Sequence, residues 1–316
     1  MKAKTKKIIG GTLALSLVAA TAVGGTFAYL TRQTEKRVNN FTFAKSDVAL
    51  NAMLTEPAWD GIVDYEYNDD GTVTPIYGYT TKMFGPDSKT VAVYGYTNGD
   101  INQPVTEKSA IDDTTKRPTT NEDGTTPITY GIDQSKSMIP GSTASKNPII
   151  TNIGNQADSW VAAKITFVYA DGDNAGTPLS IDDMAKVTDI IDIDYNSQGS
   201  DAKWEEIGDL SGGSSKTFFY TETLTKDSDP TPGVYGESTV PLFTTVSVKP
   251  EAKNEQIDEL NTMGGFVIYV EGYAVQSDVA TDYDGFKAWG NSNVVFNNTP
   301  SDSNPVDVTK LIVPAE

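Results

Sequence analysis

Short segments in which apolar and polar residues alternate, each bounded by turn residues, run through most of this chain. Because successive side chains on a strand point to opposite faces, this alternation predicts strands with one buried and one exposed face. Many such strands with few helices favour an all-β fold, and we expect an antiparallel β-sandwich of jelly-roll or immunoglobulin-like type. The expected strands are Phe41 to Phe43, Val48 to Leu54, Trp160 to Tyr169, Thr217 to Thr223, Val240 to Val248 and Phe266 to Val275.

Three stretches carry helix signals within this strand-rich chain. Ser180 can cap the N-terminus of a helix over residues 180–190, because Asp183 follows three residues later. We expect a few short helices beside the sheets. The other two are Pro250 to Met263, with the proline near the start and Gly264-Gly265 at the end, and Tyr283 to Trp289.

The composition changes to Tyr, Thr, Gly and Asp over residues 61–134, which we interpret as an insertion into a single domain spanning 29–316. Asp70-Gly71, Asn98-Gly99 and Asp123-Gly124 suit the positive φ angles of tight hairpin turns. We therefore expect a hairpin-rich insertion. A disordered linker is the alternative for this stretch.

Residues 1–28 have the layout of a secretory signal peptide. Four lysines precede the apolar run Ile8 to Val23, and Thr26 and Ala28 place small residues before a cut between Ala28 and Tyr29. The alternative is an uncleaved membrane anchor, but a span needs about 20 consecutive apolar residues and this run is shorter. We expect export and cleavage after Ala28.

The chain is strongly acidic and contains no cysteine. Removing residues 1–28 removes four lysines and no acid, so 20 basic residues remain against 43 acidic ones, a net charge of −23. This balance argues against nucleic acid as a partner, because Lys and Arg must neutralise its phosphates. Without disulfides, the remaining 288 residues must be held together by their own core. The composition is typical of a bacterial surface or matrix protein.

The absence of histidine limits the chemistry further. It excludes a Ser-His-Asp or Cys-His machine, and the lack of both His and Cys removes the usual zinc ligands. Two carboxylates would suffice for a glycosidase, but with 43 acidic residues a pair such as Glu205-Glu206 carries almost no information. We expect no catalytic residues and no enzyme activity.

Calcium is the one cofactor for which the sequence offers a partial motif. Asp192, Asp194 and Asn196 reproduce the opening of an EF-hand loop, but Ser197 and Lys203 stand where glycine and glutamate are required. The alternation in this stretch fits a strand better. A cation held by surface carboxylates around 171–173 stays open as an alternative, and otherwise we expect no cofactor.

Aromatic residues offer the remaining candidate site. We expect the four tryptophans to be packed in the core, since large aromatic side chains dominate burial. Exposed, sugar-stacking tryptophans are the alternative. The tryptophans are Trp59, Trp160, Trp204 and Trp289, and the tyrosines of a candidate glycan-binding surface in the insertion are Tyr77, Tyr79, Tyr94 and Tyr96.

Three stretches resemble a known family of surface proteins. The first joins Gly24-Gly25-Thr26-Phe27-Ala28-Tyr29-Leu30-Thr31 to Asn40-Phe41-Thr42-Phe43 and to Leu54-Thr55-Glu56-Pro57-Ala58-Trp59-Asp60. The second joins Met138-Ile139-Pro140-Gly141 to the run from Lys146 to Asn155 and to Ser159-Trp160-Val161-Ala162. The third leads from Phe218-Phe219-Tyr220 through 239–243 to Tyr273-Ala274-Val275-Gln276 and Ala288-Trp289. Together they resemble the TasA/camelysin (CalY) family of biofilm-matrix and cell-surface proteins.

The resemblance implies a secreted protein of the extracellular matrix or cell surface of a Gram-positive bacterium, cut by a SipW-type signal peptidase. Some relatives are described as metalloproteases, but a His-Glu-x-x-His helix cannot exist here. The long insertion and Ala44, where a glycine is usual, depart from the family pattern.

We expect fibres formed by strand addition, in which Tyr29 to Phe43 pairs with a sheet edge of the next subunit. The apolar residues of this segment are Tyr29, Leu30, Val38, Phe41 and Phe43. Pairing of residues 29–39 within their own sheet is the alternative. A matrix polysaccharide or a second matrix protein is a further expected partner, and a monomeric adhesin or glycan-binding module is the alternative function.

Overall fold

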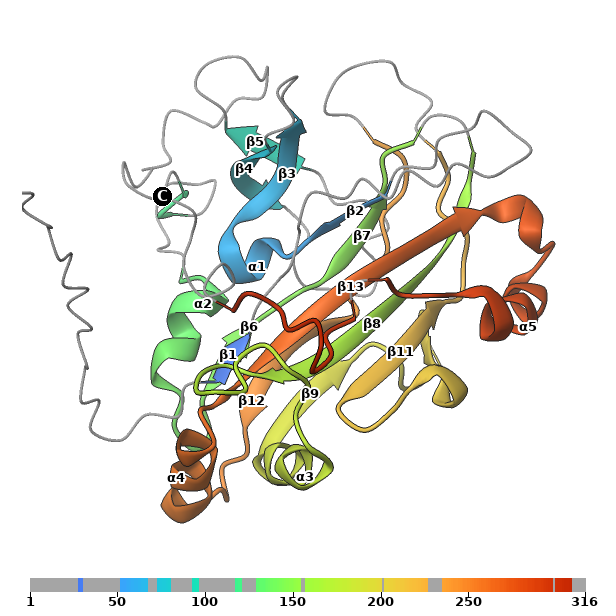
Figure 1. Ribbon diagram of the computed structural model, residues 1–316. Coiled ribbons are helices and arrows are strands. Elements are labelled where there is room, and N and C mark those ends of the chain that lie inside the picture. The colour runs from blue at the N-terminus through green and yellow to red at the C-terminus, as the bar shows by residue number, and fades with distance from the viewer. Residues whose placement is uncertain are drawn as a thin grey trace, which may run out of the picture.

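The computed structural model of the protein describes residues 28–30, 52–67, 73–80, 93–96, 117–120, 129–154, 157–200, 202–226, 235–297 and 299–308. Most of these residues form antiparallel β-sheets with a few short helices between them (Figure 1). This confirms the β-rich, antiparallel character that the alternation predicts. The apolar run of the expected signal peptide lies outside the described residues, as do Val38, Phe41 and Phe43.

A five-stranded sheet forms the centre of the molecule. Its strand order is β1 (Ala28–Leu30), β13 (Phe266–Gln276), β8 (Ser159–Tyr169), β11 (Ser215–Tyr220) and β10 (Trp204–Glu206). The β1–β13 pair is parallel and the other three pairs are antiparallel. Strands β8 and β13 pair without interruption from Phe266↔Tyr169 to Gln276↔Ser159, which makes them the longest ladder of the described chain.

Three smaller sheets surround this centre. One has the order β6 (Thr143–Ser145), β12 (Phe243–Val248) and β9 (Ile191–Tyr195), and a second pairs β2 (Ala52–Thr55) with β7 (Ile149–Asn152). The third contains β3 (Ile62–Tyr67), β4 (Val73–Thr80) and β5 (Val93–Tyr96), which pair in chain order as consecutive hairpins do. Figure 1 shows these hairpins at the top of the molecule, on the side away from helix α3 (Ile181–Ile190).

The main core lies between one face of the five-stranded sheet and the sheet of β12 and β9. Phe218 on β11 stacks on Tyr195 of β9 with 5.1 Å between ring centroids, and Tyr195 meets Phe243 of β12 at 5.8 Å. Helices α3 and α4 (Asn254–Thr262) close this core with Val187 and Leu260, which are buried. Each such buried side chain contributes about 1.5–3 kcal/mol relative to an exposed one.

The second face of the five-stranded sheet is covered as well. Trp160 of β8 stacks on Phe286 of helix α5 (Tyr283–Asn293) at 5.1 Å, and Val306 packs against Val168 and Val267. Strands β8 and β13 are therefore buried on both faces, which explains their nearly continuous apolar sequence. The expectation of one exposed face is wrong for these two strands.

The helices show where local signals were sufficient. Ser180 caps α3 as predicted, with its side chain accepting a hydrogen bond from the Asp183 N–H, and Gly264 and Gly265 end α4 with positive φ angles. Helix α4 begins at Asn254 rather than near Pro250, because the Gln256 side chain accepts from the backbone N–H of Lys253 and fixes the first turn there. Helix α5 continues beyond Trp289 to Asn293.

Two strands are shorter than the alternation predicts. The expected strand from Val240 begins at Phe243, because the N–H of Val240 bonds to the Tyr220 hydroxyl and that of Leu242 bonds to the Pro148 carbonyl. The expected strand to Thr223 ends at Tyr220. The remaining short helices are α1 (Pro57–Asp60), α2 (Gly131–Gln134), η1 (Ser135–Ser137), η2 (Gly208–Leu210) and η3 (Ser277–Val279).

Candidate functional site

Strand β1 contains both residues of the predicted cleavage site. Ala28 pairs with Phe266, Tyr29 with Val267 and Leu30 with Ile268, and all three partners on β13 are completely buried. Away from β13, the strand lies next to α2 and η1. The start of the expected assembly segment is therefore placed at an edge of the central sheet, between β13 and two short helical turns (Figure 1).

In the single chain, residues 28–30 adopt the pairing within their own sheet that we considered as the alternative to strand addition. The edge position means that another chain's strand with the same register would meet the same part of β13. Strand addition between subunits remains a prediction.

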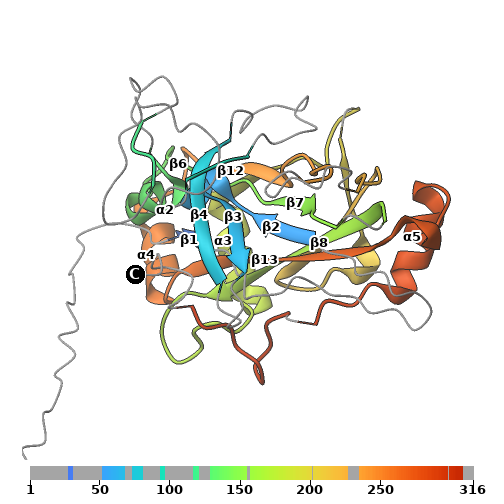
Figure 2. The same ribbon diagram turned by 90° about the horizontal axis from the view of Figure 1, so that it is seen from above.

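Figure 2 shows α4 and α5 at opposite ends of the molecule. In the chain, α4 precedes β13 and α5 follows it.

The opposite edge of the five-stranded sheet is β10, which carries Glu205 and Glu206. Glu205 accepts a hydrogen bond from the Tyr283 hydroxyl at 2.7 Å and pairs with Lys287, and Glu206 pairs with Lys216 at 2.9 Å. The bond from Lys287 lowers the pKa of the Glu205 carboxyl, and burial raises the pKa of the Tyr283 hydroxyl. A short, charged edge strand of this kind discourages pairing with another chain.

A buried ion pair joins two of the stretches that carry the family resemblance. The Lys146 ammonium lies 2.7 Å from a carboxylate oxygen of Glu56, and both side chains are completely buried. The same ammonium lies 4.9 Å from the ring centroid of Trp59, and the side-chain oxygen of Asn147 accepts from the Ala58 N–H at 2.6 Å. We call Glu56, Trp59, Lys146 and Asn147 the buried clamp.

Glycines let the backbone approach closely around the buried clamp. Gly61 ends α1 with a φ of 77°, and a Cβ atom there would lie 2.9 Å from the Tyr130 ring. A Cβ on Gly131 would lie 1.7 Å from the Ser145 carbonyl oxygen and 2.8 Å from Trp59. The sequence contains an acidic residue before Pro57 and a lysine before Asn147, but no local pattern indicates that these two residues pair.

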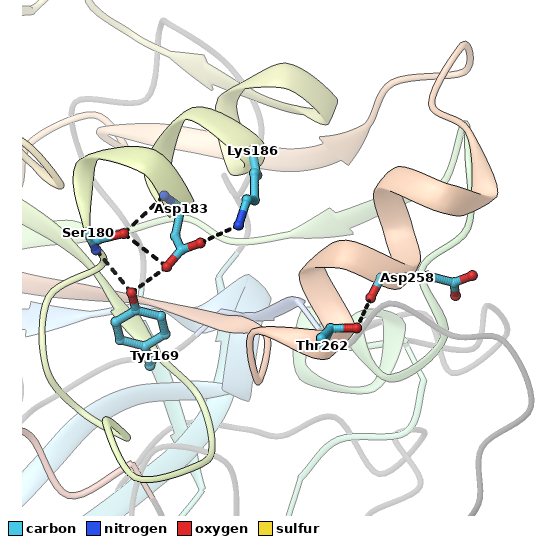
Figure 3. A network of polar contacts seen from close by, with 6 residues as sticks. All are labelled: Tyr169, Ser180, Asp183, Lys186, Asp258 and Thr262. Carbon is cyan, nitrogen blue, oxygen red and sulfur yellow. Dashed lines mark hydrogen bonds and ion pairs between the residues drawn. The ribbon is translucent and has the colours of Figure 1, made fainter.

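A second polar network lies at the surface, at the start of α3 (Figure 3). One carboxylate oxygen of Asp183 accepts from the Tyr169 hydroxyl at 2.6 Å and from the Ser180 hydroxyl at 2.9 Å, and the other pairs with Lys186 at 2.6 Å. The hydrogen bond from Lys186 is the main cause that lowers the pKa of the Asp183 carboxyl. Tyr169, Ser180 and Asp183 cap α3 and tie it to β8, and Lys186 pairs with Asp183, so the network is structural.

The calcium candidates do not come together as a site. Among the described residues, no group of three or more acidic side chains is placed to hold a metal ion. Asp192 and Asp194 lie on β9, which confirms a strand instead of an EF-hand loop. The Asp194 carboxylate accepts from the backbone N–H groups of Thr244 and Thr245 and so satisfies the irregular step in β12 between Phe243 and Val246.

The tryptophans are mostly structural, as predicted. Trp59, Trp160 and Trp204 are at most 5% exposed, and the Trp204 indole N–H donates to the Val240 carbonyl at 3.0 Å. Trp289 is partly buried against the cluster around Phe286. Core packing is therefore confirmed for the first three tryptophans, which leaves no exposed ring for stacking on sugars at those positions.

The tyrosines of the alternative glycan surface fall at matched register positions. Tyr77 pairs with Tyr96 and Tyr79 with Tyr94 across the β4–β5 ladder. Because directly opposed residues share a face and faces alternate with a period of two, these four positions belong to one face of the hairpin sheet.

One small pocket lies beside the end of β11. It has a volume of about 120 Å³, below the roughly 300–1,000 Å³ of small-molecule sites. Glu222 pairs with Lys203 at 2.6 Å, and Glu237 accepts from the Thr225 N–H at 3.1 Å, so both carboxylates are engaged. Burial raises the pKa of the Tyr220 hydroxyl to about 12. We assign no catalytic role to this pocket, which is lined by Tyr220, Glu222, Thr223, Leu224, Glu237 and Ser238.

Comparison with known proteins adds no relative to these observations. No protein-family model, no curated protein and no solved structure matches the chain.

Proposed function

We propose that this protein is an exported structural protein of the bacterial matrix or cell surface, similar to the TasA/camelysin family, that assembles into fibres by strand addition. Its sheets would be those of a sandwich of jelly-roll or immunoglobulin-like type. The observation that carries the proposal is the position of β1. This strand is an edge of the central sheet, and its second residue is the terminus expected after cleavage.

The difference between the two edges of the central sheet supports this assignment. Both edge strands have three residues and pair with buried residues of the neighbouring strand, but β10 carries two ion-paired glutamates, whereas β1 is the uncharged run Ala28-Tyr29-Leu30. When β1 leaves β13 and the same strand of a neighbouring subunit takes its place, every hydrogen bond of the register is kept. Exchange of this kind costs little free energy, which is why identical chains use it to associate.

The buried clamp is the second feature used in the proposal. The stretches around Glu56 and Lys146 are far apart in the chain, yet they meet in a fully buried ion pair. We propose that this pair fixes one arrangement of the backbone. In our proposal the clamp holds the start of the hairpins against the core while the N-terminal segment exchanges.

The test uses the mature chain, residues 29–316, and a truncated chain, residues 40–316. Electron microscopy and size-exclusion chromatography over a wide concentration range should show filaments or large oligomers only for the mature chain. A synthetic peptide of residues 29–43 should bind the truncated chain, because it supplies the missing strand. A mature chain that stays monomeric throughout would refute assembly.

A monomeric glycan-binding module is the second candidate, and the register of the four tyrosines favours it. Replacement of Tyr77, Tyr79, Tyr94 and Tyr96 by alanine should abolish binding on a glycan array if this function is correct. Thr74→Ala is the matched control, because position 74 belongs to the opposite face of the same strand from positions 77 and 79. Equal binding by the tyrosine variant and the control would exclude this surface.

A further inference from the structure

The bond that the signal peptidase is expected to cut lies within a paired strand. Ala28 and Tyr29 flank this bond, and they pair with Phe266 and Val267 in the parallel ladder of β1 and β13. A peptidase that binds its substrate as an extended strand needs the backbone N–H and C=O groups around the bond for its own hydrogen bonds. The groups of this strand that pair with β13 cannot pair with an enzyme at the same time.

The surroundings of β1 add a steric barrier. Phe266, Val267 and Ile268 are completely buried, so the ladder lies against the core. Helix α2 and turn η1 lie next to β1, and within η1 the side chain of Ser135 is buried. A peptidase would have to displace β1 from this position before it could reach the bond.

We propose that docking of β1 and cleavage after Ala28 exclude each other, so that cleavage takes place only before β1 docks. This inference rests on the export and cleavage in the proposed function. A chain whose β1 docks while the signal peptide is still attached protects itself from processing. After the cut, Tyr29 and Leu30 keep their pairing with Val267 and Ile268, so the mature chain can still dock.

The direction of β1 fixes where an uncut chain would be held. Because β1 is parallel to β13, the chain before Ala28 leaves at the start of β13, next to the turn Gly264-Gly265 at the end of α4. Only four residues separate Val23, the end of the apolar run, from Ala28. The five Cα–Cα steps from Val23 to Ala28 reach at most about 18 Å. If β1 docked in an uncut chain, the apolar run would be held within this distance of Ala28, at the α4 end of the molecule.

Protection of residues 27–30 in the full chain tests the inference without the native peptidase. The full chain, residues 1–316, is folded in detergent micelles and treated with chymotrypsin, which cuts after Phe27, Tyr29 and Leu30. Mass spectrometry should show cleavage at these bonds at least about tenfold slower than in a peptide of residues 20–36, because cutting then requires opening of β1. Cleavage of the folded chain at the peptide's rate would overturn the inference.

A matched pair of variants identifies the cause of the protection. Leu30→Pro removes a backbone N–H from β1 and should restore cleavage after Phe27 to nearly the peptide's rate, whereas Leu30→Ala keeps the N–H and should stay protected. An unchanged near-ultraviolet circular dichroism spectrum shows that Leu30→Pro still folds. Protection that persists in Leu30→Pro would contradict the role of β1, and hydrogen exchange of residues 28–30 in the unmodified chain provides a second readout.

The outcomes separate this inference from the proposed function. Protection without filaments would leave the masking of the bond intact and remove assembly. Filaments without protection would leave assembly intact and remove the masking.

Discussion

The buried clamp allows a sharp prediction about stability. Lys146→Met keeps the length of the side chain but leaves the Glu56 carboxylate without its ammonium partner. Glu56→Leu leaves the Lys146 ammonium without its carboxylate beside the Trp59 ring. Both side chains are 0% exposed and the charged atoms are 2.7 Å apart, so water cannot replace the missing partner. The double variant Glu56→Leu/Lys146→Met removes both charges together.

The expected magnitudes follow from the cost of a buried charge that has lost its ion-pair partner. Each single substitution should reduce the free energy of unfolding by about 3–5 kcal/mol, whereas the double substitution should be nearly neutral. For a chain of this size, each single variant should melt roughly 10 °C lower. The pair should therefore show a coupling of several kcal/mol in a double-mutant cycle.

Urea unfolding of the mature chain measures these differences. Tryptophan fluorescence follows the transition, and Trp59 reports on the clamp itself because its ring centroid lies 4.9 Å from the Lys146 ammonium. A surface pair, Asp133 and Lys136, provides the control, since exposed pairs couple by less than about 1 kcal/mol. Additive losses at the clamp, with no recovery in the double variant, would refute the reasoning.

Three further predictions test the packing, the capping and the electrostatics. Gly131→Ala places a Cβ atom 1.7 Å from the backbone oxygen of Ser145, so it should destabilise the protein by at least about 1–3 kcal/mol in urea unfolding. The control is Gly208→Ala, whose added Cβ atom meets nothing within 4 Å. Ser180→Ala should cost about 1 kcal/mol and Ser180→Gly only a few tenths, because glycine is tolerated at an N-cap; equal losses would argue against the cap. The lowered pKa of Glu205 means that its contribution to stability is present above the unfolded pKa of about 4.3 and is lost as the pH falls through the folded value. Stability measured between pH 6 and pH 3 should therefore fall more steeply in the unmodified chain than in Glu205→Gln, and parallel curves would contradict this.

Local signals predicted the elements whose causes lie within a few residues. The helix over 180–190 was predictable because its cap, Ser180, and the capped residue, Asp183, are three positions apart. The strand over 266–275 was predictable from its alternation, and it extends to Gln276 in the structure. The start of β12 was not predictable, because the backbone N–H of Val240 donates to the hydroxyl of a tyrosine twenty residues earlier in the chain. Long-range partners of this kind leave no periodic pattern.

The candidate site divides in the same way. Residues 28 and 29 were predicted as a cleavage site from small residues after an apolar run, a purely local pattern. Their parallel pairing with Phe266 and Val267 joins segments more than 200 residues apart, and no alternation in the sequence specifies a partner or a direction. The buried clamp shows the same limit, since Glu56 and Lys146 are 90 residues apart.

The sequence by itself determined the strand-rich character, the acidic charge and the absence of histidine and cysteine chemistry, because these depend on residue types and on short periods. Only the tertiary structure decided which strands are neighbours, that β8 and β13 are covered on both faces, and that Glu56 and Lys146 form a buried pair. The reason is physical: burial and ion pairing arise between surfaces that come together only when distant segments fold onto one another, so a single segment does not contain the information about its partner.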